Sequence, residues 1–193
     1  MKTIIAIDPG VAGGVAVCAF GTTVCHPMPA TQGDVLELIR DLKRAADTEG
    51  AECVCVLEEV GGFAGKAQPG SAMFKFGEGY GFLKGVIQAL GIKLELVRPQ
   101  VWQKSFGLGT ASRCASKTEW KNKLKAEAQR RFPDLTVTLQ TADALLILEW
   151  ALRATPCADA RTAQRSVPTT TISSLHEAGS EHQQNNNQAT ERK

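Results

Sequence analysis

The chain has 193 residues, of which 43% are hydrophobic and 22% are charged, and its formal net charge at pH 7 is +2. This length suffices for one well-packed α/β domain and excludes two substantial ones. The nearly balanced charge does not by itself mark a nucleic-acid-binding protein, so any argument for such a function depends on where the charged residues lie.

The N-terminal segment MKTIIAIDPG has one lysine and a short apolar run that ends at an aspartate. A signal peptide or a membrane span needs a longer apolar stretch. The six cysteines include no CxxC pair of the kind that binds zinc or performs redox chemistry, so we expect reduced thiols. These features predict a soluble, cytoplasmic protein with no membrane partner.

Three short strands are predicted first along the chain. Residues 4–7 form an apolar, mostly β-branched run that ends in Asp8, and a Pro-Gly turn follows. A second apolar run covers residues 14–20, and a third strand is expected around residues 22–26. The pattern predicts an antiparallel meander whose first strand ends in a carboxylate.

A helix and a buried strand follow the meander. Apolar residues recur at helical spacing from Val35 to Leu42. Residues 53–57 are continuously apolar, as in a strand covered on both faces, and they lead directly to Glu58. A central strand therefore also ends in a carboxylate, and the glycine-rich residues 61–70 are expected to form a loop after it.

Residues 74–90 contain several glycines and end in a stronger helical pattern over residues 82–90. A strand is predicted over residues 93–97, and Pro99 suits the first turn of the helix that follows. Further helices are predicted over residues 117–131 and 142–153.

The C-terminal part of the chain, from residue 155 to 193, is rich in Thr, Ser, Gln, Asn and charged residues. Such a composition offers few apolar groups to offset the entropy cost of ordering, so it predicts a disordered polar tail. The predicted organisation is one domain over residues 1–154 and a tail over residues 155–193.

The order of the predicted elements is that of an RNase H-like α/β fold, a mixed five-stranded sheet flanked by helices. In that architecture the first and the central strand end side by side, and the last helix packs next to them. Asp8, Glu58 and Asp143, which lies in the first turn of the last helix, are therefore expected to converge.

Each acid also has a plainer interpretation. Asp8 is a favoured residue type for a turn before Pro-Gly, and Asp143 could simply compensate the helix dipole. Glu58 directly follows five apolar strand residues, where a merely solvated charge is costly, although the functional carboxylate could equally be Glu59. Gly10, Gly13 and Gly14 could simply shape the hairpin. The three acids taken together favour a functional site.

Three carboxylates in a partly buried site repel one another unless a cation neutralises them. Oxygen ligands favour Mg²⁺, with Mn²⁺ as a substitute, over zinc. Two such ions can clamp the attacking water and the leaving 3′ oxygen of a phosphodiester. Asp8, Glu58 and Asp143 are therefore candidate metal ligands and catalytic residues of a hydrolase that uses two ions.

Five stretches resemble, in this order, the RuvC family of Holliday junction resolvases, and most closely its phage and plant-organelle members. They are IIAIDPGVAGGVAV, VLEEV, RPQVWQKSF, SKTEWKNKLKAEAQRRFP and TADALLILEWAL, and the resemblance covers about residues 3 to 153. It implies a divalent-metal-dependent endodeoxyribonuclease that works as a homodimer on four-way junctions or other branched DNA in recombination and repair. Asp8, Glu58 and Asp143 match the metal-binding acids of the family.

The resemblance also assigns Lys117 a catalytic place near the scissile phosphate, although an exposed lysine packed beside Trp120 is an equal alternative. Glu59 replaces a usual glutamine. The family places an acid or histidine one turn before the last aspartate, where this chain has Leu139 and Gln140. An amide oxygen binds a hard cation more weakly than a carboxylate does, so a DNA-binding relative without activity is an alternative.

Binding to DNA would depend on basic residues around the acids, and it would be strongly salt-dependent. Phe63, Phe74 and Phe76 are expected in glycine-rich loops, where they could stack on unpaired bases or form a small satellite core. The candidate nucleic-acid-binding residues are Phe63, Lys66, Phe74, Lys75, Lys117 and Lys121.

The glycines of residues 74–90 could permit close packing at a two-fold interface. An actin-like kinase is disfavoured because it needs two such domains. An RNA-strand hydrolase of the same fold remains an alternative substrate class.

Overall fold

The structure is a computed structural model that describes residues 1–61 and 70–154. The predicted tail, together with Phe63 and Lys66, lies outside these ranges. The strands are β1 (Lys2–Asp8), β2 (Gly14–Ala19), β3 (Thr22–Pro27), β4 (Glu52–Glu58) and β5 (Lys93–Val97). The helices are α1 (Gln32–Thr48), α2 (Gly70–Ala89), α3 (Pro99–Lys104), α4 (Lys117–Arg131) and α5 (Ala142–Ala154), and a 3₁₀ turn covers Ala111–Arg113.

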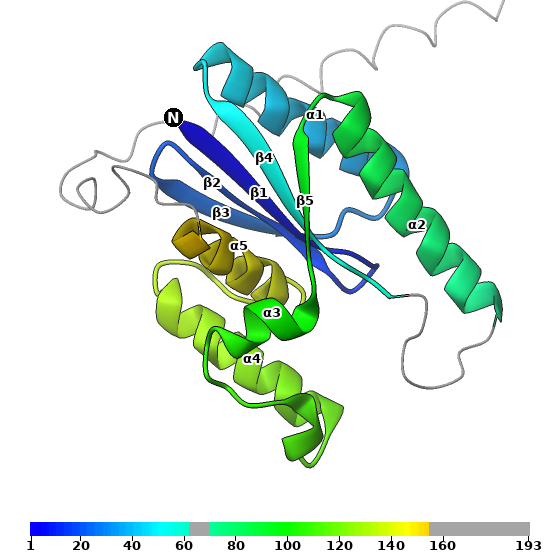
Figure 1. The fold of residues 1–193 in the computed structure, drawn as a ribbon, viewed down its shortest axis with the longest axis vertical. Coiled ribbons are helices and arrows are strands. Elements are labelled where there is room, and N and C mark those ends of the chain that lie inside the picture. Colours follow the sequence, from blue (N-terminus) through cyan, green and yellow to red (C-terminus); the bar gives the residue numbers. More distant parts are fainter. Residues whose placement is uncertain (62–69, 155–193) are drawn as a thin grey trace, which may run out of the picture. The chain divides into compact units, whose positions relative to one another are not determined.

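The five strands form one mixed sheet in the order β3-β2-β1-β4-β5. The pairs β1–β2 and β2–β3 are antiparallel, whereas β4 is parallel to both β1 and β5. Helices cover both faces: α1 and α2 lie on one side, and α3, α4 and α5 lie on the other (Figure 1). The predicted RNase H-like α/β class is confirmed by this arrangement.

Side chains alternate between the two faces of the sheet, because successive residues of a strand point to opposite sides. Ile5 and Ile7 of β1 are buried with the residues of α1 and α2. Ile4 and Ala6 are buried with the residues of α5. Asp8 continues the second series, so the alternation along β1 directs its carboxylate to the α5 face.

The start of α5 is fixed by a short polar network. Thr138 and Thr141 cap each other, since the backbone amide of each donates to the hydroxyl oxygen of the other, at 3.0 and 3.2 Å. Gln129 of α4 donates from its amide to the carbonyl oxygen of Leu135 at 2.9 Å and accepts from the Val137 amide at 3.2 Å. The connection from α4 therefore delivers the first turn of α5 to a defined place on the sheet.

Helix α2 is longer than the sequence pattern predicted. It begins at Gly70 and runs to Ala89, so Phe74 and Phe76 lie in a helix and not in the predicted loop. Glycine within a helix costs up to about 1 kcal/mol relative to alanine, but the burial of Leu83, Val86 and Ile87 anchors the C-terminal half. Within the described ranges, no helix is both long and apolar enough to cross a membrane.

Candidate active site

The carboxylates of Asp8 and Glu58 are brought to one edge of the sheet by the pairing of β1 with β4. Ala6 pairs with Val56 and Ile7 with Leu57, so the same register places Asp8 level with Glu58. Both side chains belong to the face that α5 covers, because Ala6 and Val56 are buried in the core beneath it. Asp143 in the first turn of α5 is 5% exposed and completes the group.

Two glycines permit the close approach of chain segments at this edge. Gly14 pairs with Asp8 across the hairpin, and a Cβ at Gly14 would lie 2.6 Å from the carbonyl oxygen of Gln140. A Cβ at Gly13 would lie 2.1 Å from the carbonyl oxygen of Asp8. Side chains at these two positions would force the hairpin and the segment before α5 apart, so glycine is needed there for packing.

The two adjacent glutamates at the end of β4 have different partners. Glu58 accepts a hydrogen bond from the indole Nε1 of Trp102 at 2.9 Å, and Trp102 is fully buried. Glu59 is paired with Arg98 at 2.9 Å, and its side chain is 38% exposed. The structure therefore separates two residues that the sequence left equivalent: Glu58 belongs to the acid group, and Glu59 belongs to a surface ion pair.

The electrostatics of the acid group are unfavourable for three free carboxylates. Burial, with the charges of Asp143 and Glu58 added to it, raises the pKa of Asp8 to about 8. Burial also raises the pKa of Glu58 to about 7. The hydrogen bond from Trp102 opposes this rise, and the charge of Asp143 adds to it. Asp143 thus lies close enough to Asp8 and Glu58 for its charge to disfavour their ionised forms.

One lysine neutralises part of this charge. Lys121 of α4 donates a hydrogen bond from its Nζ to Oδ2 of Asp143 and forms an ion pair with it. Burial alone would lower the pKa of Lys121, but attraction to Asp143, and to Asp8 and Glu58 beyond it, raises the pKa above its usual value. Lys117, one turn earlier, is exposed and has no ion pair among the described residues.

The donor chemistry of the group fits a hard divalent cation. All three side chains offer carboxylate oxygens, and Oδ1 of Asp143 is buried without a hydrogen-bond partner. In the described part of the chain, however, no three acidic, histidine or cysteine side chains lie close enough together to hold a metal ion as they stand. A bound cation would therefore require local side-chain movement, including that of Lys121.

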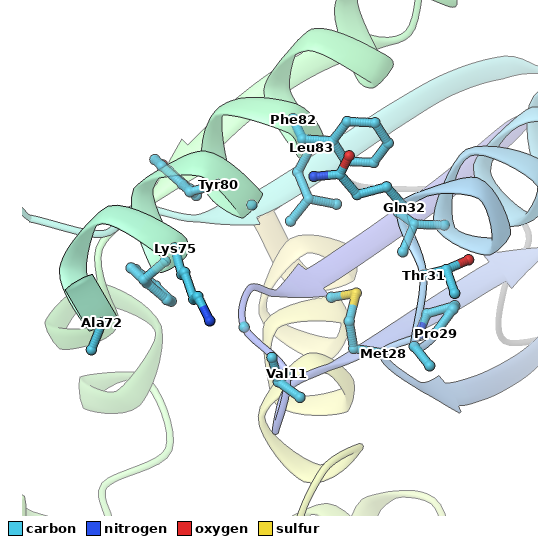
Figure 2. Close-up of a pocket in the computed structure, with 15 residues that line it drawn as sticks. Val11, Met28, Pro29, Thr31, Gln32, Ala72, Lys75, Tyr80, Phe82 and Leu83 are labelled. Carbon is cyan, nitrogen blue, oxygen red and sulfur yellow. The ribbon is translucent and has the colours of Figure 1, made fainter.

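The remaining predicted residues lie around this edge. Phe74 is 74% exposed, and Gln140 and Leu139 are exposed just before α5. Lys75 lines an apolar cavity of about 420 Å³ between the start of α1, helix α2 and the loop after β1. Figure 2 shows Lys75 on the side of this cavity toward Val11, which lies in the turn that follows Asp8.

Neither a protein-family model nor a curated protein matches the sequence. Solved structures of RuvC do match. The RuvC structure from Thermus thermophilus is 16% identical with a TM-score of 0.48, and the match covers 79% of this chain and 96% of that one. T. thermophilus RuvC in complex with a Holliday junction substrate is 15% identical with a TM-score of 0.48, over 80% and 96% of the two chains.

One fold can host many functions, so the function of this chain has to be inferred from the acid group and its surroundings.

Two functional features were missed in the sequence. Trp102 was part of the RPQVWQKSF stretch, but its bond to Glu58 spans 44 positions of the chain. Lys121 was assigned to DNA binding, although its place beside the buried Trp120 and Leu124 stripe could have signalled a half-buried lysine. Both contacts depend on tertiary packing.

The raised pKa values predict that the metal-free protein loses stability as pH rises. Asp8 and Glu58 take up protons on folding in the window from their ordinary pKa values near 4 to their folded values of about 8 and 7. The folded state therefore binds more protons in this window, and its stability falls as pH increases through it.

The test compares the wild type with Asp8→Asn, a variant in which residue 8 no longer titrates. In EDTA, the melting temperature of Asp8→Asn should exceed that of the wild type most at pH 8, and the difference should shrink toward pH 5. Differential scanning calorimetry across this range measures it. A difference that does not depend on pH would show that Asp8 ionises in the folded chain as it does in water.

Proposed function

We propose that this chain is a divalent-metal-dependent endonuclease that cleaves branched DNA, with the four-way junction as its substrate. The observation that carries the proposal is the group of three desolvated carboxylates at the carboxyl ends of β1 and β4 and the start of α5. An unpartnered buried oxygen of Asp143 lies within it. Buried acids with perturbed pKa values are typical of functional sites.

Asp8, Glu58 and Asp143 would hold Mg²⁺ or Mn²⁺, with two ions in the active state. In such a site the ions neutralise the carboxylates and activate a water for in-line attack on a phosphodiester. Burial beneath α5 would keep the carboxylates away from bulk water, and the Trp102 bond would limit the freedom of Glu58.

Lys121 is the basic residue best placed to act on the substrate. Its ammonium group is half-buried among the acids, so an approaching phosphate would meet it at the same edge of the sheet. With Asp143 holding a cation, Lys121 would be free to donate to a phosphate oxygen. In this proposal Lys121 takes the role that the family resemblance gave to Lys117, and Lys117 contributes to the basic surface of α4.

The choice of a junction as substrate follows from the resemblance of the sequence motifs to the RuvC family. The test offers labelled four-way junction, matched duplex and RNA–DNA hybrid to the purified protein with Mg²⁺, with Mn²⁺ or with EDTA. The proposal expects metal-dependent nicks confined to the junction. Cleavage of the hybrid would instead indicate an RNA-strand hydrolase, and junction binding without cleavage would indicate a DNA-binding relative.

A junction has two-fold symmetry, so a resolvase needs two active sites, and the proposal includes a homodimer. Gly77, Gly81 and Gly85 recur every four residues on α2, and an added Cβ at any of them would meet nothing within 4 Å. This open stripe would let a second helix approach closely. Light scattering at micromolar concentration should give a dimer mass, and a monomer mass would contradict the proposed interface.

A further inference from the structure

Trp102 connects the hydrophobic core to the acid group. Its ring is 0% exposed in the core between the sheet, α4 and α5, and a buried indole N–H needs an acceptor. The acceptor here is Oε2 of Glu58 at 2.9 Å, a carboxylate of the acid group, and not a backbone carbonyl of the core. A core residue is thus joined directly to the candidate active site.

The bond constrains a flexible side chain. Glutamate loses considerable rotamer freedom when it is fixed, so an unsupported Glu58 would sample several orientations at the end of β4. A hydrogen bond from a fully buried ring selects one orientation, in which Oε2 is engaged and Oε1 remains available. The ring itself has little freedom, because it is buried among residues of the sheet, α4 and α5.

The same short segment also fixes the neighbouring carboxylate. Arg98, which caps the N-terminus of α3, pairs with Glu59, and the Glu59 amide donates to the carbonyl oxygen of Val97 at 2.7 Å. The residues around α3 therefore hold Glu58 and Glu59 in different places: one bond comes from the core, and the other comes from the surface.

We infer that Trp102 is a positioning residue, which holds the Glu58 carboxylate in the orientation needed to bind a divalent cation; this inference rests on the proposed function. Trp102 touches neither substrate nor metal and acts only through Glu58. Partners of this kind, which hydrogen-bond to a metal ligand, typically change metal affinity about 10- to 100-fold when they are removed.

The test uses variants that separate the N–H group from the bulk of the ring. Trp102→Phe removes the donor and part of the ring, and 3-benzothienylalanine in place of Trp102 keeps the fused-ring shape while lacking the N–H. Trp120→Phe is the matched control, because Trp120 is 5% exposed in the same core and is carried by α4.

Isothermal titration calorimetry with Mn²⁺ measures the effect without reference to cleavage. Both changes at position 102 should weaken Mn²⁺ binding about 10-fold or more relative to the wild type, and Trp120→Phe should bind within about 2-fold of the wild type. The benzothienyl protein should melt close to the wild type. Equal Mn²⁺ affinity in the wild type and the benzothienyl protein would overturn the inference.

A second measurement distinguishes failure of the inference from failure of the proposed function. If the wild type itself binds no Mn²⁺, the proposed function fails. The positioning bond is then tested by the indole ¹H–¹⁵N signal of Trp102, which is identified by its loss in Trp102→Phe. Glu58→Ala should shift this signal and expose it to faster hydrogen exchange; an unchanged signal would show that Trp102 does not hold Glu58.

Discussion

Asp8→Asn should lower the rate of metal-dependent junction cleavage roughly 10³-fold. The pKa of Asp8 is raised further than that of Glu58, and the Asp8 carboxylate would ligate the cation that activates the attacking water. The amide retains the shape of the side chain and loses its charge. Junction binding should be retained or strengthened, since a charge that repels phosphate is removed.

The matched control is Glu59→Gln, because Glu59 is also a carboxylate at the end of β4 but is paired with Arg98 at the surface. Its cleavage rate should stay within about 3-fold of the wild type, as is usual for exposed ion pairs that contribute little energy. Single-turnover cleavage and electrophoretic mobility shifts measure the two properties separately. Equal losses in both variants would contradict the assignment of the acid group.

Lys121→Met should destabilise the metal-free protein by about 2 kcal/mol, which corresponds to a fall in melting temperature of roughly 4–8 °C. The Asp143 side chain is only 7% exposed, so loss of its counter-ion leaves a buried charge. We place the cost below that of a fully buried pair because the Lys121 side chain is 34% exposed and water can partly take its place.

Divalent cations should reverse this loss, because a bound ion supplies the positive charge that Lys121 gave. The melting temperature of Lys121→Met should therefore rise more on addition of Mg²⁺ than that of the wild type. Lys117→Met is the control, since Lys117 is exposed and lies one turn away on the same helix. If both variants melt alike in EDTA, Lys121 is not the counter-ion of Asp143.

Most of the fold could be predicted from the sequence because its strands carry simple patterns. The continuous apolar run of β4 and the β-branched run of β1 mark buried strands, and the acids follow directly from where these runs stop. Thr141, directly before an apolar helical run, also marks the start of α5. Convergence of the acids then followed from the order of the elements alone.

The rest depended on tertiary contacts that have no local pattern. Gly70, Gly77 and Gly79 made the N-terminal half of α2 resemble a loop, although packing of its C-terminal half carries the helix through them. Glu58 and Glu59 are equivalent in sequence and differ only because Trp102 and Arg98 reach them from α3. Lys117 and Lys121 share a helix face, and only the packing of α4 beside α5 brings Lys121 to Asp143.

The most direct test of the account is the position of manganese in crystals of the protein soaked in Mn²⁺. Anomalous diffraction should place Mn²⁺ between the carboxylates of Asp8, Glu58 and Asp143, with the Lys121 ammonium moved away from Asp143. Crystals that show no manganese there, and in which Lys121 remains paired with Asp143, would contradict the claim that this group of acids is a metal-dependent nuclease centre.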